Sequence, residues 1–133
     1  MESGTPRDLT PYRISAIVCA MACRVIYYRQ PSGRVPMIDF LDALTSVKHR
    51  AAILADIDLL ASEGPILPFP LTSAIAAHRG LRELRTRFAG AQFRMIYTIV
   101  DGDPVVLHAF QKTSSAQLSR EYAVAAERAR SVR

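Results

Sequence analysis

The sequence predicts an α+β domain in which helices pack on one side of an antiparallel sheet. Two amphipathic helical patterns follow each other in the first half of the chain, and three apolar stretches separated by turn signals fill most of the second half. A further helical pattern closes the chain. This segregation of helices and strands along the sequence is typical of α+β architecture.

The first half contains one strand and two helices. Segment 24–30, RVIYYRQ, is rich in β-branched and aromatic residues and predicts a strand. Pro36 then stands at a favourable first position of a helix. Apolar residues at i, i+3, i+4 and i+7 predict a helix over 36–44. The same spacing predicts a second helix over 47–63, and Gly64 ends it.

Three consecutive strands form the rest of the predicted sheet. They cover 81–88, 93–100 and 104–112, and each carries β-branched, aromatic or alternating residues. An Asp-Gly dipeptide separates the last two strands, and it is a strong hairpin signal because glycine tolerates the positive φ of the turn. We therefore expect the first strand plus an antiparallel three-strand meander.

Two segments have weaker patterns. Segment 65–80 contains three prolines and no clear period, so it predicts a connecting loop with one helical turn near Ser73. Segment 114–133 has the spacing of a helix. Ser114 and Gln117 predict a capping box at its start.

Size and charge bound the class of protein. The chain has 133 residues, 50% of them hydrophobic, which suffices for one domain with its own core. It carries 17 Lys+Arg against 12 Asp+Glu, for a formal charge of +5. Acids outnumber bases in 37–63, whereas arginines outnumber acids in 79–100. This asymmetry is typical of a nucleic-acid binder with a second, protected face, and a solvated surface that merely segregates charge is the alternative.

The N-terminal segment is predicted to lie outside the domain. Cys19 and Cys23 are too few for a zinc site and imply no disulfide framework, which fits a reducing cytoplasm. The apolar segment 14–23 is about ten residues long, too short to cross a membrane, and its leader is poorly cationic. We expect residues 1–20 to be an extension and 21–133 to form the domain, with Met1 and Met21 both open as the natural start.

An arginine inside an apolar strand is the strongest sign of a site. A buried cation without a partner costs several kcal/mol, so Arg94 is either paired or faces an anion. If the three strands present the same face, the charged residues of matching parity converge there and form a concave cationic patch suited to a phosphate backbone. These residues are Glu83, Arg85, Arg87, Arg94, His108 and Lys112.

Simpler interpretations remain for several of these residues. Arg85 and Arg87 can be ordinary exposed strand charges, and His108 can be a structural histidine. Tyr122, on the last helix, can be a core aromatic. No histidine or cysteine pattern has the spacing of metal ligands, so we expect no metal and no cofactor.

Several motifs resemble the RelE/HigB superfamily of type II toxin–antitoxin toxins, in particular the HigB-like branch of phages and plasmids. They are GLRELR at 80–85, FRMIY at 93–97 and VVLHAFQK at 105–112, with GRVPMIDFLDAL earlier. The resemblance covers about 23–130. It implies a small toxin with a RelE-like fold, which enters the ribosomal A site in the cytoplasm and cleaves mRNA without a metal. It also implies a cognate helix-turn-helix, HigA-like antitoxin and a toxin–antitoxin hetero-oligomer.

The resemblance also implies roles for individual residues. Arg94 matches a phosphate-stabilising arginine, and Arg85 and Lys112 match basic positions that hold the backbone and the developing charge. Tyr122 falls where some members place a tyrosine for proton transfer or base stacking. Members carry lysines where this strand has Glu83 and two arginines, and an arginine cannot act as a base. The general base is therefore open between Glu83 and His108. The candidate RNA-binding residues are Arg79, Arg82 and Arg87.

Two other functions share these features. A ParE-like toxin has the same fold and acts on DNA gyrase through protein contacts, and a non-catalytic RNA- or protein-binding module is the second alternative. Fold alone does not separate them. The arginine-lined sheet face favours RNA.

Overall fold

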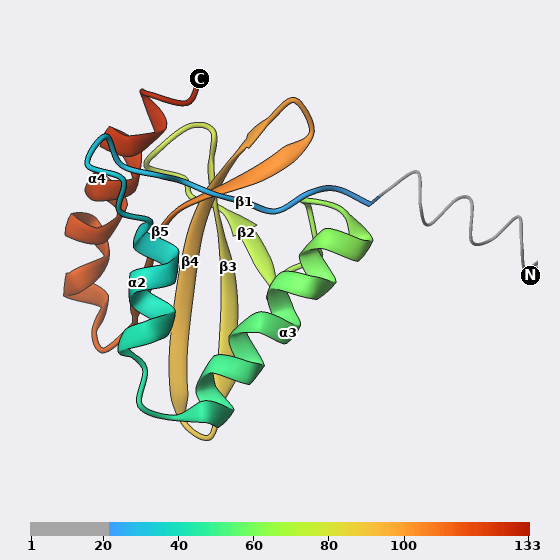
Figure 1. Cartoon of the computed structure of the whole chain (residues 1–133), viewed down its shortest axis with the longest axis vertical. Coiled ribbons are helices and arrows are strands. Elements are labelled where there is room, and N and C mark those ends of the chain that lie inside the picture. Colours follow the sequence, from blue (N-terminus) through green and yellow to red (C-terminus); the bar gives the residue numbers. More distant parts are fainter. Residues whose placement is uncertain (1–21) are drawn as a thin grey trace, which may run out of the picture.

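The computed structural model describes residues 22–133, so the expected extension over 1–20 lies outside the described part of the chain (Figure 1). The elements are β1 (Ile26–Tyr27), α2 (Pro36–Ala43), α3 (Val47–Glu63), β2 (Thr72–Ala74), β3 (Leu81–Phe88), β4 (Ala91–Val100), β5 (Asp103–Gln111), a 3-10 turn (Ser115–Gln117) and α4 (Leu118–Ala129). The described chain is thus a small α+β domain, as predicted. No helix within it is long and apolar enough to cross a membrane.

Local sequence signals set most of the boundaries. Ser46 precedes α3, and its side chain accepts a hydrogen bond from the backbone N–H of His49 at 3.2 Å. Gly64 ends α3 with a φ of 102°. The turn between β4 and β5 has positive φ at both Asp101 and Gly102, as the Asp-Gly signal predicts.

The sheet has five strands in the order β1-β5-β4-β3-β2. Strands β2 to β5 pair antiparallel, whereas β1 pairs parallel with β5. Only two residues of the strand expected over 24–30 join this ladder. The helical turn expected near Ser73 is wrong, because Ser73 pairs with Glu83 on the edge of β3. A three-residue strand is too short to leave a period in the sequence.

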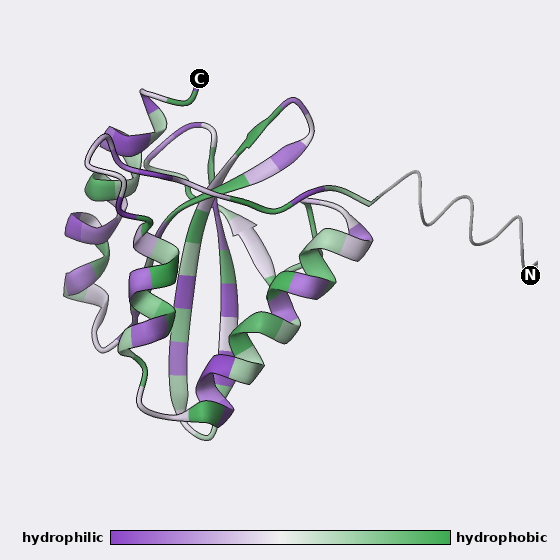
Figure 2. Ribbon diagram, in the orientation of Figure 1, coloured by the Kyte–Doolittle hydropathy of each residue, from purple (hydrophilic) through white to green (hydrophobic). Residues whose placement is uncertain are grey.

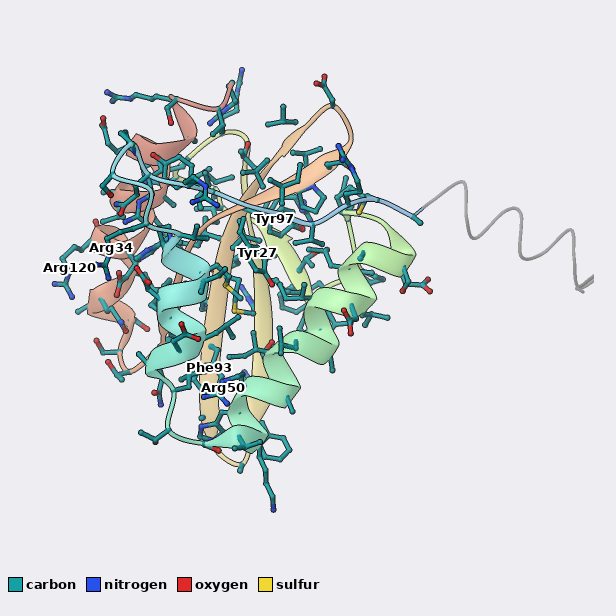
Figure 3. The ribbon with its side chains drawn as sticks, in the orientation of Figure 1. Tyr27, Arg34, Arg50, Phe93, Tyr97 and Arg120 are labelled. Atoms are coloured by element: carbon teal, nitrogen blue, oxygen red, sulfur yellow. The ribbon has the colours of Figure 1, made fainter. Side chains whose placement is uncertain are left out.

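Helices cover both faces of the sheet, which corrects the expectation of helices on one side. Helices α2 and α3 cover one face, where Phe93 and Tyr97 of β4 are fully buried (Figures 1 and 3). Helix α4 covers part of the other face, where Ala125 and Ala129 pack with Ile96. Figure 2 shows β4 as mostly hydrophobic with hydrophilic bands. A near-continuous apolar run is typical of a strand buried on both faces, and here α4 covers the face that was expected to be open to solvent.

The start of the last helix also differs from its prediction. The side chain of Ser114 makes no capping hydrogen bond. Instead, Gln117 Oε1 accepts from the backbone N–H of Thr113 at 2.9 Å. The capping box is therefore wrong, because a 3-10 turn intervenes and the glutamine fixes the chain before α4.

Candidate functional site

The sheet register brings six of the predicted site residues onto one face. Glu83 pairs with Ile96, and Ile96 pairs with His108. One step along the strands, Arg85 pairs with Arg94. The next step pairs Arg87 with Gln92, whose carbonyl accepts the backbone N–H of Lys112 at 2.8 Å. Since residues directly opposite in a sheet point to the same side, the predicted convergence on one face is confirmed.

The centre of this face is buried rather than open, which corrects the expectation of a concave patch of free cations. Glu83 is 2% exposed and Arg94 is 8% exposed. Arg94 Nη1 donates to Glu83 Oε2 at 2.9 Å, and Arg85 Nε donates to the same oxygen at 2.9 Å. Arg85 Nη2 also lies 2.8 Å from this oxygen, as an ion pair. Tyr122 Oη donates to Glu83 Oε1 at 2.7 Å. We call Glu83, Arg85, Arg94 and Tyr122 the Glu83 cluster.

The Glu83 cluster keeps an excess of positive charge. One carboxylate lies between two guanidinium groups, and a buried carboxylate of this kind is stable only because its oxygens accept charge-assisted hydrogen bonds. A guanidinium has five N–H donors. Within residues 22–133, the Arg94 side chain makes one hydrogen bond, through Nη1. The other donors of Arg94, and the partly exposed side chain of Arg85, are suited to an oxyanion.

Tyr122 is held as a proton donor. Burial, together with the hydrogen bond to Glu83, raises the pKa of Tyr122 to about 12. The phenol is therefore protonated at neutral pH. It can donate a hydrogen bond or a proton, whereas it is a poor base in this environment.

The solvent-exposed end of the face carries further cations. Arg87 is exposed and Lys112 is partly buried, and both flank Gln92 beside the turn that joins β3 to β4. We call Arg85, Arg87 and Lys112 the cationic end. It adjoins the Glu83 cluster through Arg85, whose side chain is 28% exposed, whereas that of Arg94 is 10% exposed.

His108 lies on the same face but is bonded to α4. Its Nε2 lies 2.7 Å from Glu121 Oε1, and Arg128 Nη1 donates to its Nδ1 at 3.2 Å. Because Nδ1 accepts, the ring proton is on Nε2 and points at Glu121. Burial lowers the pKa of His108. The ring is thus a neutral anchor between β5 and α4, outside the Glu83 cluster.

The remaining two RNA-binding candidates do not join this face. Arg82 points to the opposite side, where Nη2 donates to Thr72 Oγ1 at 2.9 Å and Nε to Tyr97 Oη at 3.3 Å. These contacts of Arg82 are typical of a structural residue. Arg79 is exposed in the turn before β3, and its side chain has no hydrogen bond or ion pair within residues 22–133.

Phe69, which is not among the residues predicted from the sequence, lies beside the site. Phe69 is 73% exposed, and the guanidinium carbon of Arg85 lies 5.2 Å from the centre of its ring. A hollow of about 270 Å³ opens next to it, lined by Asp56, Pro70, Leu71, Arg85 and Arg87. An aromatic residue between two prolines is the only sequence signal for it, and such a loop has no period to interpret.

The described chain offers no metal centre to this site. Among residues 22–133, no group of three or more His, Cys, Asp or Glu side chains could hold a metal ion. The chemistry that the residues present can support is hydrogen bonding, charge stabilisation and proton transfer.

The fold and the site define a small α+β domain with a cationic sheet face. Residues 39–130 match the family of the phage derived protein Gp49-like (DUF891). The match covers well over half of the chain, so the chain belongs to the Gp49-like family, which is related to HigB-like toxins. A comparison with curated proteins gives no match.

Proposed function

We propose that this chain is the toxin of a type II toxin–antitoxin system and that it cleaves mRNA on the ribosome. Membership of the Gp49-like family supports the toxin assignment. The observation that carries the ribonuclease assignment is the Glu83 cluster, in which two arginines are fixed on a rigid sheet beside an exposed cationic end.

The proposed reaction needs positioning and charge stabilisation. The ribose 2′-hydroxyl gives its proton to a general base and its oxygen attacks the adjacent phosphorus. The bond to the 5′-oxygen breaks and this oxygen takes up a proton, so that a 2′,3′-cyclic phosphate and a 5′-hydroxyl form. Arg87 and Lys112 hold the RNA backbone, while Arg85 and Arg94 stabilise the charge that develops on the phosphoryl oxygens. Glu83 orients both guanidinium groups, because it bonds to each of them.

Proton transfer to the leaving oxygen is assigned to Tyr122. A phenol with a pKa of about 12 keeps its proton until a stronger base, such as a departing alkoxide, appears nearby. Glu83 holds this phenol in place. The two candidates for the general base are Glu83 and His108. The oxygens of Glu83 already accept from Arg85, Arg94 and Tyr122. The ring nitrogens of His108 already contact Glu121 and Arg128.

The proposal includes a cytoplasmic protein partner. A helix-turn-helix antitoxin of the HigA-like kind would cover the cationic end or block entry into the ribosomal A site. Acidic antitoxin residues at this surface would make the association rate depend on salt. Co-expression with the product of an adjacent helix-turn-helix gene tests this, and cells that remain arrested would count against it.

Growth arrest after induced expression distinguishes the proposed function from its alternatives. Incorporation of a labelled amino acid is expected to stop before incorporation of labelled thymidine. An earlier stop of DNA synthesis would contradict the proposal and favour a ParE-like action on gyrase. A folded, abundant chain that stops neither process would favour a non-catalytic binding module.

A further inference from the structure

We infer that Phe69 is a stacking platform for one base of a single-stranded RNA whose backbone lies on the cationic end. This inference rests on the proposed function, because it takes the bound RNA to be the substrate. It assigns a binding residue outside the sheet, in the loop between α3 and β2.

The exposure of Phe69 and its cationic neighbour are the first argument. A phenylalanine that is 73% exposed leaves most of its ring open to a ligand. The Arg85 guanidinium, 5.2 Å from the ring centre, is held by Glu83 and does not follow the loop. Aromatic rings and arginine planes are the two groups on which unpaired bases stack. Here the two groups are already side by side.

The loop that carries Phe69 is fixed before any ligand binds. The backbone N–H of Leu71 donates to the carbonyl of Pro68 at 3.0 Å, and the carbonyl of Leu71 accepts from the backbone N–H of Arg85 at 2.8 Å. Leu67, two residues before the aromatic ring, is buried in the core. Binding at Phe69 therefore costs little ordering entropy, which favours a ligand-binding role over a mobile loop tip.

The hollow beside Phe69 is lined by two cationic side chains and one carboxylate, and this arrangement suits a nucleotide. Arg85 and Arg87 lie on its wall, and so does Asp56, whose Oδ2 accepts from Thr86 Oγ1 at 2.7 Å. The Asp56 carboxylate repels a phosphate inside the hollow. A neutral base is tolerated there, while the phosphates remain on the arginines. Charge complementarity thus favours RNA over an apolar protein segment.

A tryptophan probe tests the position directly, because the chain has no tryptophan of its own. The probe ligand is a short single-stranded RNA with 2′-O-methyl riboses, which 2′-hydroxyl attack cannot cleave. Phe69→Trp is expected to lose fluorescence when this RNA is added, as the indole stacks on a base. The matched control is Ile66→Trp, since Ile66 is 66% exposed in the same loop, and it is expected to keep its fluorescence. Equal quenching of both variants, or of neither, would overturn the inference.

Affinity for the same RNA gives the second readout. Phe69→Ala is expected to bind about 10-fold more weakly, in the range of the loss of one stacked base. Phe69→Tyr should bind as the wild type does, and so should Ile66→Ala. All variants should melt at the wild-type temperature, since both side chains are exposed. Wild-type RNA affinity in Phe69→Ala, combined with loss of antitoxin retention, would assign the surface to a protein partner instead.

Different results would refute the stacking role of Phe69 and the proposed nuclease function. A wild-type chain that binds RNA at Phe69 but leaves mRNA intact on the ribosome refutes the nuclease and keeps the stacking platform. A wild-type chain that cleaves mRNA, with Phe69→Ala cleaving and binding equally well, refutes only the platform.

Discussion

Replacing Glu83 with glutamine tests whether the carboxylate is what makes a buried arginine tolerable. The substitution keeps the size of the side chain but removes the charge that faces Arg94 and Arg85. Both Glu83 and Arg94 are nearly fully buried, so the change leaves a guanidinium without a counter-ion in a dry site. Breaking a buried pair in this way costs about 3–5 kcal/mol.

For a domain of this size, that loss lowers the melting temperature by roughly 10–20 °C. Thermal unfolding followed by circular dichroism measures it. The matched control is Glu127→Gln, which breaks an exposed ion pair with Arg130 and should cost less than about 1 kcal/mol. Equal melting temperatures for the two variants would refute the reasoning. Adding Arg94→Met to Glu83→Gln should restore part of the loss, because it removes the unpaired charge.

Three further predictions concern other parts of the chain. Tyr122→Phe removes a hydrogen bond to a carboxylate and should cost about 1.5–3 kcal/mol in chemical denaturation; an unchanged midpoint would contradict the contact. Burial lowers the pKa of His108 below 6.5, so the unfolded chain binds its proton first and stability should fall as the pH drops below about 6.5. His108→Gln should flatten that part of the pH profile, and a profile identical to wild type would exclude His108 as its source. A chain that starts at Met21 should fold and arrest growth, as thermal melting and induced expression can show. Loss of folding would instead place the segment before Met21 in the core.

Much of the fold follows from period and turn chemistry. The two helices of the first half appear where the helical spacing predicts them, because each buries one periodic face. The three strands of the meander appear where apolar stretches between turn signals predict them. Strand parity also placed Glu83 and Arg94 on one face of the sheet. The alternation of residues along a strand does not say which element covers a face of the sheet. The packing of α4 on the face of Glu83 and Arg94 is therefore not predicted by it. The Glu83–Arg94 pair also required the register, which depends on contacts far apart in the sequence.

The site was only partly predictable for the same reason. Charged residues within strands leave a visible signal, and Arg85 and Arg94 were found by it. Phe69 owes its position to the core contact of Leu67 and to the backbone contact of Leu71 with β3, and neither is visible in a loop sequence. Charge alone groups Arg82 with the other arginines, whereas strand alternation places it on the opposite face of the sheet.

Cleavage of a ribosome-bound mRNA by the purified chain tests the central claim most directly. Wild-type protein is expected to cut within the codon in the A site and to leave a 2′,3′-cyclic phosphate. Arg94→Ala should cut about 10²-fold more slowly while staying folded, since Glu83 keeps Arg85 and Tyr122 as partners. Arg94→Lys should recover only part of the rate, because it restores charge without the planar geometry. An intact mRNA with wild-type protein, or wild-type cleavage by a folded Arg94→Ala variant, would contradict the account.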